Sequence, residues 1–460
     1  MDLHEACGVF GIYAPDEDIA RLTYFALFAL QHRGQESSGI ATSDGKRIHL
    51  IANTGLVSQV FREEALLRLP GYIAIGHNRY STTTSSNYSC SQPIVVDNGL
   101  HSIAVAHNGN ITNSGLVTRE LSEQGYPFLT ASDAETIANL ILSSTEKDWT
   151  SRIRQSMRKL QGAYSLTIMT PTALFGVRDP LGMRPLCLGH LGNGKWVISS
   201  ESCALDHIGA SFIREIEPGE IVMIDTDGLK SFKETSDKHA LCIFEHIYFA
   251  RPDSIINNCL LYEARQAMGA SLAEEFPVEA DLVIGVPDSA TPAAVGYASR
   301  SGIPLGMGLV KNHYTGRTFI RPTQTLRDLG VKLKFNPMRK LLEGKRLVLI
   351  DDSIVRGTTT PQVIRLLRKS GAKEVHMRVC SPPISFPCFM GVDMASKQEL
   401  IATHKNIEEI REFIDADSLG FLSLENLVRS TGQPKNQLCL ACFTGDYPLP
   451  VQLELDSITG

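Results

Sequence analysis

The chain has no long hydrophobic run. None of the apolar stretches in its 460 residues approaches the roughly 18 residues that a helix needs to cross a bilayer. The first six residues, MDLHEA, are acidic, and they lack the basic and apolar segments of a secretory signal. We therefore expect a cytoplasmic protein that makes no use of a membrane.

An excess of positive charge is also absent. The formal net charge is -6 and the sequence pI is near 6.1. Bulk attraction to nucleic acid is therefore excluded, and any phosphate site must be local, made of backbone N–H groups and a few basic side chains. Hydrophobic residues make up 43% and charged residues 20%, as in ordinary globular proteins.

The sequence lacks internal repeats, coiled-coil heptads and low-complexity tracts. Its length exceeds that of one ordinary core, so we expect two domains. The pattern breaks into polar residues at about 225–240, which we interpret as a linker. The predicted first domain covers residues 7–230 and the second covers 231–460, with a short leader at 1–6.

The two halves differ in the order of their predicted strands and helices. Strand-like runs such as YIAIGHNRY and SIAVAHNGNI outnumber helical ones in the first half, which predicts a layered α+β domain. In the second half, short apolar strands alternate with helices, as in ADLVIGVPDS, TPAAVGYASRSG, RLVLIDDSIVRGTTT and PQVIRLLRKSGA. This alternation indicates an α/β domain with a parallel sheet, and such domains bind ligands at the carboxyl ends of their strands.

The stretch RLVLIDDSIVRGTTT has the strongest chemical signal. A strand at Leu347–Ile350 ends in the carboxylates of Asp351 and Asp352, and a glycine-containing loop then opens a helix. Backbone N–H groups and hydroxyls at such a helix start hold a phosphate. Paired carboxylates suit the hydroxyls of a sugar, directly or through Mg²⁺. The alternative is an ordinary turn with an aspartate cap, and the absence of GKS or GKT excludes a Walker loop.

This loop resembles the phosphoribosyl-pyrophosphate (PRPP) loop of type I phosphoribosyltransferases. GVPDSA then offers the Ser289 hydroxyl beside Asp288, and the basic loop KNHYTGRTFIRPTQTLRD matches a lid that closes over pyrophosphate. A solvated basic face is the alternative for that loop. The resemblance implies a Mg²⁺ site at Ser289, Asp351 and Asp352. It implies PRPP contacts at Asp351, Asp352, Ser353, Arg356, Gly357, Thr358, Thr359, Lys311 and Arg317.

A cysteine stands at the head of the first buried strand, CGVFGI. A nucleophilic thiol needs a base, and His32 or His107 could provide one, although no pattern completes a papain-like triad. The other hypothesis makes Cys7 the first residue. An α-amino group has a pKa near ~7.7, so a useful fraction is neutral and can accept the thiol proton. This hypothesis requires that residues 1–6 are a propeptide.

Polar motifs follow that would complete a site for an amino acid with an acyl side chain. Asn108 and the Gly109 N–H in AHNGNITN would form an oxyanion hole. Arg79 in GHNRYSTTT would clamp a carboxylate, and Asp133 in TASDAETIA would bind an ammonium group. Glutamine is the natural candidate for such a substrate.

Ten cysteines in a cytosolic chain do not indicate disulfides. We interpret five of them as small core hydrophobes: Cys90, Cys187, Cys203, Cys259 and Cys380. Cys439 and Cys442 form a C-x-x-C pair, Cys242 opens the second domain, and Cys388 lies in PPISFPCFMG. Spacing alone leaves a zinc site, a redox pair and no metal all open.

Taken together, CGVFGI, LQHRGQESSGI, GHNRYSTTT, HNGN and SDAE resemble the N-terminal-nucleophile (class II) glutamine amidotransferases, whose fold is an αββα sandwich. Joined to DDSIVRGTT, the chain from Cys7 to about Gly445 is similar to the glutamine PRPP amidotransferase family. The resemblance implies that Cys7 is the nucleophile and that Asn108 and Gly109 form the oxyanion hole. It implies glutamine contacts at Arg33, Arg79, Thr82 and Asp133.

One branch of that family holds a [4Fe–4S] cluster through cysteines in contexts like CIFEHIYFARPDS, PPISFPCFMG and CLACFTG, all of which occur here. The resemblance therefore implies a structural cluster bound by four thiolates, with zinc as the alternative. The implied ligands are Cys242, Cys388, Cys439 and Cys442.

The implied reaction has two halves. Glutamine is hydrolysed to glutamate and ammonia, and ammonia then displaces pyrophosphate from C1 of PRPP to give 5-phosphoribosylamine, the first committed intermediate of purine synthesis. We also expect an internal passage for ammonia, feedback inhibition by purine nucleotides and a homotetramer. The rival interpretations are a hexosamine-phosphate synthase, an asparagine synthetase and a PRPP-sensing repressor. The DDSIVRGTT loop disfavours the first two, and the lack of a basic face disfavours the third.

Overall fold

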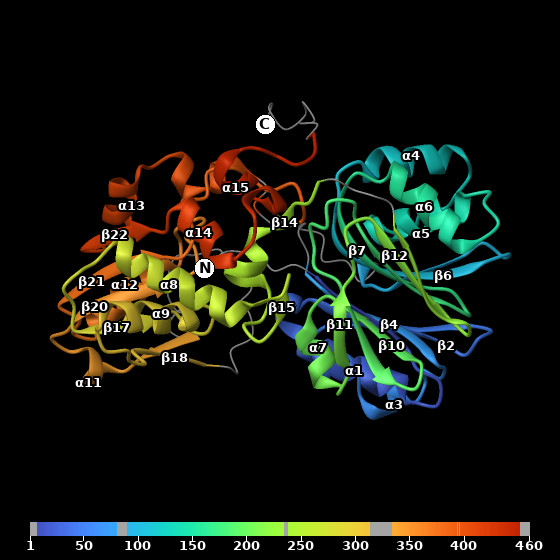
Figure 1. Ribbon diagram of the computed structural model, residues 1–460, viewed down its shortest axis with the longest axis horizontal. Helices are drawn as coiled ribbons and strands as arrows, with labels where there is room; N and C mark the ends of the chain where they lie inside the picture. The colour runs from blue at the N-terminus through green and yellow to red at the C-terminus, as the bar shows by residue number, and fades with distance from the viewer. Residues whose placement is uncertain are drawn as a thin grey trace.

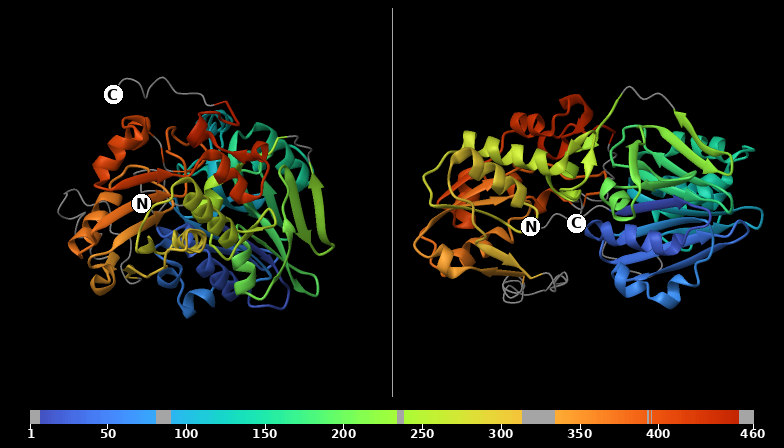
Figure 2. Two further views of the ribbon diagram at one scale, coloured as in Figure 1. Left: turned by 60° about the vertical axis from the view of Figure 1, so that its left-hand side comes forward. Right: turned by 60° about the horizontal axis from the view of Figure 1, so that its bottom comes forward.

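The structure is a computed structural model that describes residues 7–80, 90–233, 238–312, 334–392, 394 and 396–450. The proposed propeptide, Thr82 and the residues Arg317 and Arg321 of the basic loop KNHYTGRTFIRPTQTLRD lie outside these ranges. The N-terminal half, blue to green, and the C-terminal half, yellow to red, form two bodies that meet along one side (Figure 1) and stand side by side in the right view of Figure 2. Among the described residues, no helix is both long and apolar enough to span a membrane.

The first sheet of the N-terminal half, sheet A, has seven antiparallel strands in the order β11-β9-β10-β1-β4-β2-β3. The bounds are β1 Gly8–Tyr13, β2 Ser37–Ser43, β3 Ile48–Thr54, β4 Ile73–Arg79, β9 Cys187–Gly192, β10 Lys195–Ser199 and β11 Ser211–Glu215. Strand β1 is central and buried along its whole length, as its apolar sequence GVFGIY predicts. The chain therefore delivers Cys7 to the middle of the sheet.

The second sheet, sheet B, has six antiparallel strands in the order β13-β12-β8-β7-β6-β5. The bounds are β5 Ile94–Asp97, β6 Ser102–Ile111, β7 Gly162–Met169, β8 Leu174–Arg178, β12 Glu220–Asp225 and β13 Gly228–Lys233. The two sheets pack face to face through apolar side chains that include Val9 and Ile75 from sheet A and Ala106 and Leu174 from sheet B.

Helices cover the outer face of each sheet, as Figure 1 shows at its lower and upper right. Helices α1 (Ile19–Ala29) and α7 (Ser202–His207) bury their apolar sides with sheet A. Helices α4 (Ser114–Glu123), α5 (Asp133–Ser143) and α6 (Trp149–Lys159) do so with sheet B. The short helices α2 (Val57–Val60) and α3 (Glu63–Leu66) follow β3. The predicted αββα sandwich is confirmed.

The linker predicted at 225–240 is wrong over its first part. Strand β13 pairs with β12 through Lys233, so the expected boundary at residue 230 falls inside a strand. The segment GLKSFK is polar because β13 is an edge strand, and charged side chains are tolerated on an edge that faces water.

The second half is built on a parallel sheet, sheet E, in the order β17-β20-β21-β22. The bounds are β17 Leu282–Gly285, β20 Arg346–Asp351, β21 Glu374–Val379 and β22 Ser418–Phe421. After β17 the chain runs outward to Leu305, which bridges Val283 in parallel, whereas after β20 it runs the other way to β21. The strand order therefore reverses between β17 and β20, and such a switch point is where open α/β sheets bind ligands.

Helices α8 (Leu261–Glu275) and α9 (Thr291–Ser301) pack along each other, and α9 packs on β17 and β20. Helices α12 (Thr360–Lys369) and α13 (Ile407–Ile414) pack against β21 and β22. In the described part of this half, the other α-helices are α11 (Arg339–Leu342), α14 (Leu424–Thr431) and α15 (Ala441–Thr444). The half also has these short strand pairs: β14 (Leu241–Cys242) with β23 (Leu438–Cys439), β15 (Ile255–Ile256) with β16 (Cys259–Leu260), and β18 (Leu309–Lys311) with β19 (Phe335–Pro337).

Candidate active sites

Antiparallel pairing positions the Cys7 thiol at the end of β4. Gly8 lies opposite Asn78, so Cys7 lies beside Arg79 and Tyr80. The Cys7 Sγ is 3.5 Å from the Tyr80 carbonyl oxygen and 3.4 Å from the Tyr80 N–H, which donates to it. Burial raises the pKa of the Cys7 thiol, and the nearby positive charges, of which Arg79 exerts the largest effect, act in the opposite direction. The thiol is therefore protonated at rest and needs a base to become a nucleophile.

The predicted oxyanion-hole residues lie on β6, in the facing sheet. The two sheets meet just before them, where the His77 Nε2 is 3.0 Å from the His107 carbonyl oxygen. The Asn108 side chain is buried, and neither its Nδ2 nor its Oδ1 has a partner among the described residues. A buried amide without a partner is costly in a structural role and is expected where a ligand completes it.

The backbone conformation and the close packing at position 109 require a glycine. Its φ is +145°, and a Cβ there would lie 1.9 Å from the Ala163 carbonyl oxygen on the neighbouring β7. Only glycine fits a strand at such a close approach. The Gly109 backbone is therefore fixed next to the unpartnered Asn108 amide.

Asp133 is the first residue of α5, with Ser132 as its N-cap. Its Oδ2 accepts a 2.9 Å hydrogen bond from the Ile111 N–H at the end of β6, and its charge acts on the imidazole of His107. The structure thus joins the predicted ammonium ligand to the same strand as Asn108. Arg79 lies in the other sheet, at the end of β4.

Arg33 is fully buried, and each of its three side-chain nitrogens donates to a partner. Its Nε donates to the Cys7 carbonyl oxygen at 3.0 Å, and its guanidinium pairs with Glu201 and with Glu245. This geometry favours a role for Arg33 in holding Cys7. Glu201, Glu245 and Arg184 are residues that the sequence reasoning missed, although a glutamate inside the apolar run CIFEHIYF was a usable signal that a buried partner exists.

The second candidate site lies at the switch point between β17 and β20. The Asp352 carboxylate accepts 2.6 Å hydrogen bonds from the hydroxyls of Ser289 and Ser353. Asp351 accepts from the Asp352 N–H at 2.9 Å. The two carboxylates and the Ser289 hydroxyl, predicted as a Mg²⁺ set from distant parts of the chain, therefore stand together.

Burial raises the pKa of Asp351 to about 7, with a further contribution from the charge of Asp352. Burial also raises the pKa of Asp352. Two adjacent carboxylates that are both desolvated are expected where a cation binds, because a cation stabilises the charged form of both.

The loop after Asp352 leads into the N-terminus of α12. Gly357 has a φ of +67°, and Thr359 is the N-cap residue. Arg356 pairs with Glu399 at 3.0 Å, and Lys311 pairs with Asp288 at 2.7 Å. The helix N-terminus and these two cations make this end of the sheet suitable for phosphate groups.

The four cysteines that the sequence singled out come together where the halves of the chain meet. Cys242 on β14 lies opposite Cys439 on β23, and the pKa of the Cys442 thiol is raised by burial and by the charges of the other three thiols, Cys388 included. In the described ranges, no group of three or more His, Cys, Asp or Glu side chains forms a ready site for a metal ion. Of the five cysteines predicted to fill the core, four are buried and Cys259 is only partly buried.

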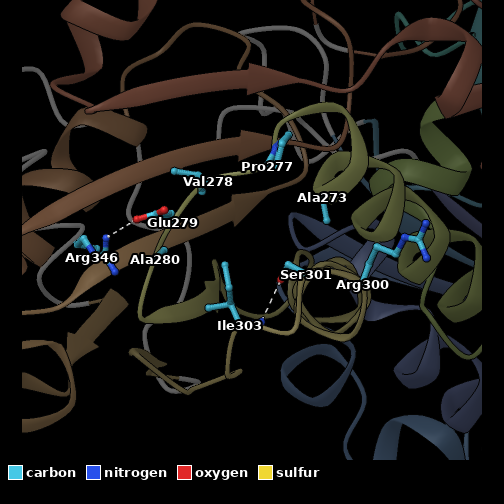
Figure 3. Close-up of a pocket in the computed structure, with 9 residues that line it drawn as sticks. All are labelled: Ala273, Pro277, Val278, Glu279, Ala280, Arg300, Ser301, Ile303 and Arg346. Carbon is cyan, nitrogen blue, oxygen red and sulfur yellow. Dashed lines mark hydrogen bonds and ion pairs between the residues drawn. The ribbon is translucent and has the colours of Figure 1, made fainter.

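A third feature, a pocket of about 480 Å³, lies at the other end of sheet E (Figure 3). It is lined by residues that include Arg300, Ser301 and Arg346, and Arg346 is the first residue of β20 whereas Asp351 is the last. Both arginines are paired with acids, Arg300 with Glu274 and Arg346 with Asp281. The pocket is thus separate from the two candidate sites.

Comparison with known proteins assigns the two halves. The family model described as the glutamine amidotransferase domain matches residues 77–207, and the one described as the phosphoribosyl transferase domain matches residues 256–381. Amidophosphoribosyltransferase of Synechocystis sp. is 50% identical over 469 aligned positions, which cover 99% of this chain and 94% of that protein. The chain belongs to the amidophosphoribosyltransferase family.

Amidophosphoribosyltransferase of Methanocaldococcus jannaschii is 48% identical, and the alignment covers 97% of this chain and 98% of that protein. The solved structure of glutamine phosphoribosylpyrophosphate (PRPP) amidotransferase from B. subtilis, complexed with ADP and GMP, is 45% identical. It matches with a TM-score of 0.92 over 97% of this chain and 98% of that one.

The protein is therefore an amidophosphoribosyltransferase-family enzyme of purine biosynthesis. It makes 5-phosphoribosylamine, glutamate and pyrophosphate from PRPP, glutamine and water. The predicted fold class and function are confirmed. The phosphoribosyl transferase match also excludes the hexosamine-phosphate synthase and asparagine synthetase alternatives, whose second domains are different.

Proposed function

We propose that Cys7, as the N-terminal residue of the mature chain, is the nucleophile that hydrolyses glutamine, and that the Asp351–Asp352 loop binds PRPP. The observation that carries the proposal is the Asn108 amide, buried and unpartnered among the described residues, beside a Gly109 that no other residue can replace. Strand β6, which has both residues, contacts β1, the strand that follows Cys7, and an amide donor with a backbone N–H is what a tetrahedral oxyanion needs.

In the first half-reaction the Cys7 Sγ attacks the side-chain carbonyl carbon of glutamine, and the thiol proton passes to the α-amino group that removal of residues 1–6 exposes. The Asn108 Nδ2 and the Gly109 N–H donate to the oxyanion. The C–N bond breaks as the α-ammonium returns its proton to the leaving nitrogen, which leaves as ammonia. Water then hydrolyses the thioester and releases glutamate.

Arg79 would bind the carboxylate of glutamine and Asp133 its ammonium group. Arg79 lies beside Cys7 in the strand register, and Asp133 is hydrogen-bonded to the strand that has Asn108. Thr82, which lies outside the described residues, stays a predicted contact. We place Arg33 behind the thiol, where it holds the Cys7 carbonyl.

In the second half-reaction ammonia attacks C1 of PRPP and displaces pyrophosphate. Asp351 and Asp352 would bind the ribose hydroxyls, and the loop from Ser353 to Thr359 with the N-terminus of α12 would hold the 5′-phosphate. Lys311 would contact the pyrophosphate, and Arg317, outside the described residues, stays a predicted contact. Ammonium has no lone pair, so we infer that ammonia passes between the sites inside the protein.

The donor set at Ser289, Asp351 and Asp352 fits Mg²⁺, because it consists of oxygens and two carboxylates whose charges burial disfavours. When bound there, Mg²⁺ would neutralise charge on the departing pyrophosphate. The chain's own carboxylates orient the ribose and keep it at the carboxyl end of β20.

Because the four thiols lie near one another, we propose that Cys242, Cys388, Cys439 and Cys442 would hold a [4Fe–4S] cluster, with zinc as the second candidate. A cluster there would tie the start and the end of the second domain together. Visible absorption near 400 nm with iron and sulfide in the anaerobically purified protein would support the cluster, and zinc without sulfide would contradict it.

Purine nucleotides are proposed inhibitors, since the B. subtilis relative was solved with ADP and GMP. A homotetramer and a cytoplasmic location stay predictions, to be checked by native mass and by fractionation.

Cys7→Ala tests the two half-sites. We expect loss of glutamine-dependent synthesis with retention of synthesis from ammonium salts, because the second site does not use the thiol. Cys187→Ala, which removes a buried thiol from the same sheet, is the matched control and should keep both activities. Glutamine-dependent synthesis by Cys7→Ala, or loss of both activities, would contradict the assignment.

A further inference from the structure

Four fully buried charged residues form a linked group behind Cys7. They are Arg33, Arg184, Glu201 and Glu245, and the exposed fraction of each side chain is 1% or less. Arg33 pairs with Glu201 and with both oxygens of Glu245, at 2.9 and 3.1 Å for the latter. The Arg184 guanidinium pairs with Glu245 at 3.3 Å. The four contribute two positive and two negative charges, and Glu201 also pairs with the partly exposed His32 at 2.7 Å.

The group spans both halves of the chain. Arg33, Arg184 and Glu201 belong to the glutaminase half, whereas Glu245 opens the segment Glu245–Phe249 that follows Cys242 and belongs to the phosphoribosyltransferase half. Glu245 is therefore the carboxylate that the second half inserts between two arginines of the first.

Arg33 connects this group to the thiol residue itself. Its Nε donates to the Cys7 carbonyl oxygen at 3.0 Å, and its aliphatic atoms lie against Gly8, where a Cβ would come within 3.5 Å of the Arg33 Cβ and Cδ. The position of the Cys7 backbone therefore depends on where Glu245 holds the guanidinium.

Arg184 connects the same carboxylate to the oxyanion strand. One Arg184 nitrogen donates to the Met390 carbonyl oxygen at 2.9 Å. The next residue, Gly391, packs on Gly109 so closely that a Cβ there would be 2.9 Å from the Gly109 carbonyl carbon. Asn110 on the same strand donates its side-chain N–H to the Phe389 carbonyl oxygen at 2.9 Å. Residues 389–391 thus back the strand that presents Asn108 and Gly109.

We propose that Glu245 is a positioning residue for glutamine hydrolysis, supplied to the glutaminase site by the phosphoribosyltransferase half. It holds the nucleophile through Arg33 and the oxyanion strand through Arg184 and residues 389–391. This inference rests on the proposed role of Cys7 and of the Asn108–Gly109 pair. One carboxylate sets the spacing between the two parts of the site, so the glutaminase half alone would be incomplete.

Glu245→Gln tests this role. The substitution keeps the shape but leaves two buried guanidinium groups with one carboxylate, so the arginines shift. We expect kcat for glutamine hydrolysis to fall about 10- to 100-fold with little change in KM, since displacement of a reacting group by about 1 Å has that effect. Synthesis from ammonium salts should stay within about twofold of wild type, because Asp351 and its loop are not altered.

A second readout follows the thiol without turnover. The rate at which a chloroketone analogue of glutamine alkylates Cys7, measured by intact mass, should fall together with kcat. Glu245→Asp keeps the charge, and it should fold and show a smaller fall in both rates. Glu215→Gln is the matched control: Glu215 pairs with buried Arg178 and accepts from the Asn257 N–H in the other half, yet it touches neither Cys7 nor residues 389–391. It should leave both rates unchanged.

Wild-type alkylation and hydrolysis rates in both Glu245 variants would overturn the proposal. So would an equal fall in glutamine-dependent and ammonia-dependent synthesis, or an equal fall in Glu215→Gln, since each would indicate general destabilisation. A wild-type enzyme in which the analogue labels a residue other than Cys7 would instead refute the assignment of the nucleophile, on which this inference depends.

Discussion

His246 should make the protein sensitive to acid, and His246→Phe should remove that part of the sensitivity. The imidazole is fully buried, and neither ring nitrogen has a hydrogen-bond partner among the described residues. Burial lowers its pKa from about 6.5 to about 4, and the nearby charge of Arg265 acts in the same direction. The folded protein therefore holds a neutral ring where the unfolded chain would take up a proton.

The sign and size follow from this difference. Because the pKa is depressed in the folded state, the stabilising contribution is complete above pH 6.5 and is lost as the pH falls towards 4. Between the unfolded-state pKa of about 6.5 and pH 5 there are about 1.5 pH units. Each lowers the free energy of unfolding by about 1.4 kcal/mol, so the loss at pH 5 is about 2 kcal/mol. Phenylalanine does not titrate, so the variant should gain about 2 kcal/mol over wild type between pH 8 and pH 5.

Urea unfolding of both proteins at pH 8, 7, 6 and 5 measures this gain. A difference in unfolding free energy between variant and wild type that is the same at every pH reflects the larger phenyl ring. Only the part of the difference that changes with pH tests the role of the histidine. His239→Gln, at an exposed position, controls for the loss of a histidine that stays in water. The same free-energy difference between His246→Phe and wild type at pH 8 and pH 5 would refute the reasoning.

Three further predictions concern the two sites. Asn108→Ala should lower kcat for glutamine hydrolysis by about 10²- to 10³-fold, as loss of an oxyanion donor does, while ammonia-dependent synthesis is unchanged; a wild-type kcat in steady-state assays would remove Asn108 from the site. Asp351→Asn and Asp352→Asn should each abolish synthesis with either nitrogen source, and product formation from ammonium chloride would contradict their role. Chelation of Mg²⁺ should stop pyrophosphate release but leave labelling of Cys7 by the glutamine analogue intact, and loss of both would indicate a metal role beyond the PRPP site.

Local signals allowed much of the fold to be predicted. Apolar runs such as Leu347–Ile350 and the residues after Cys7 identify buried strands without any knowledge of their partners, and alternation with helices indicates a parallel sheet. The segment at 228–233 was misread because an edge strand exposes one side and its charges resemble those of a linker.

The candidate sites also contain residues that the sequence predicts and residues that it does not. Asp351 and Asp352 are adjacent in sequence and stand beside a glycine loop, so the chemistry is visible before the fold. The group of Arg33, Arg184 and Glu245 could not be predicted. These charges come from three distant segments, and the sequence does not show that folding buries them together. A charged residue within an apolar stretch, such as Glu245 in CIFEHIYF, indicates that a buried partner exists, but not which one.

The most direct test of the account is the mass of the N-terminal peptide of the active enzyme after reaction with a chloroketone analogue of glutamine. We predict a peptide that begins at Cys7 and has a single adduct on the Cys7 thiol, because the thiol needs a free α-amino group as its base. An active enzyme whose peptide retains Met1 or Asp2, or whose adduct lies on another residue, would contradict the account.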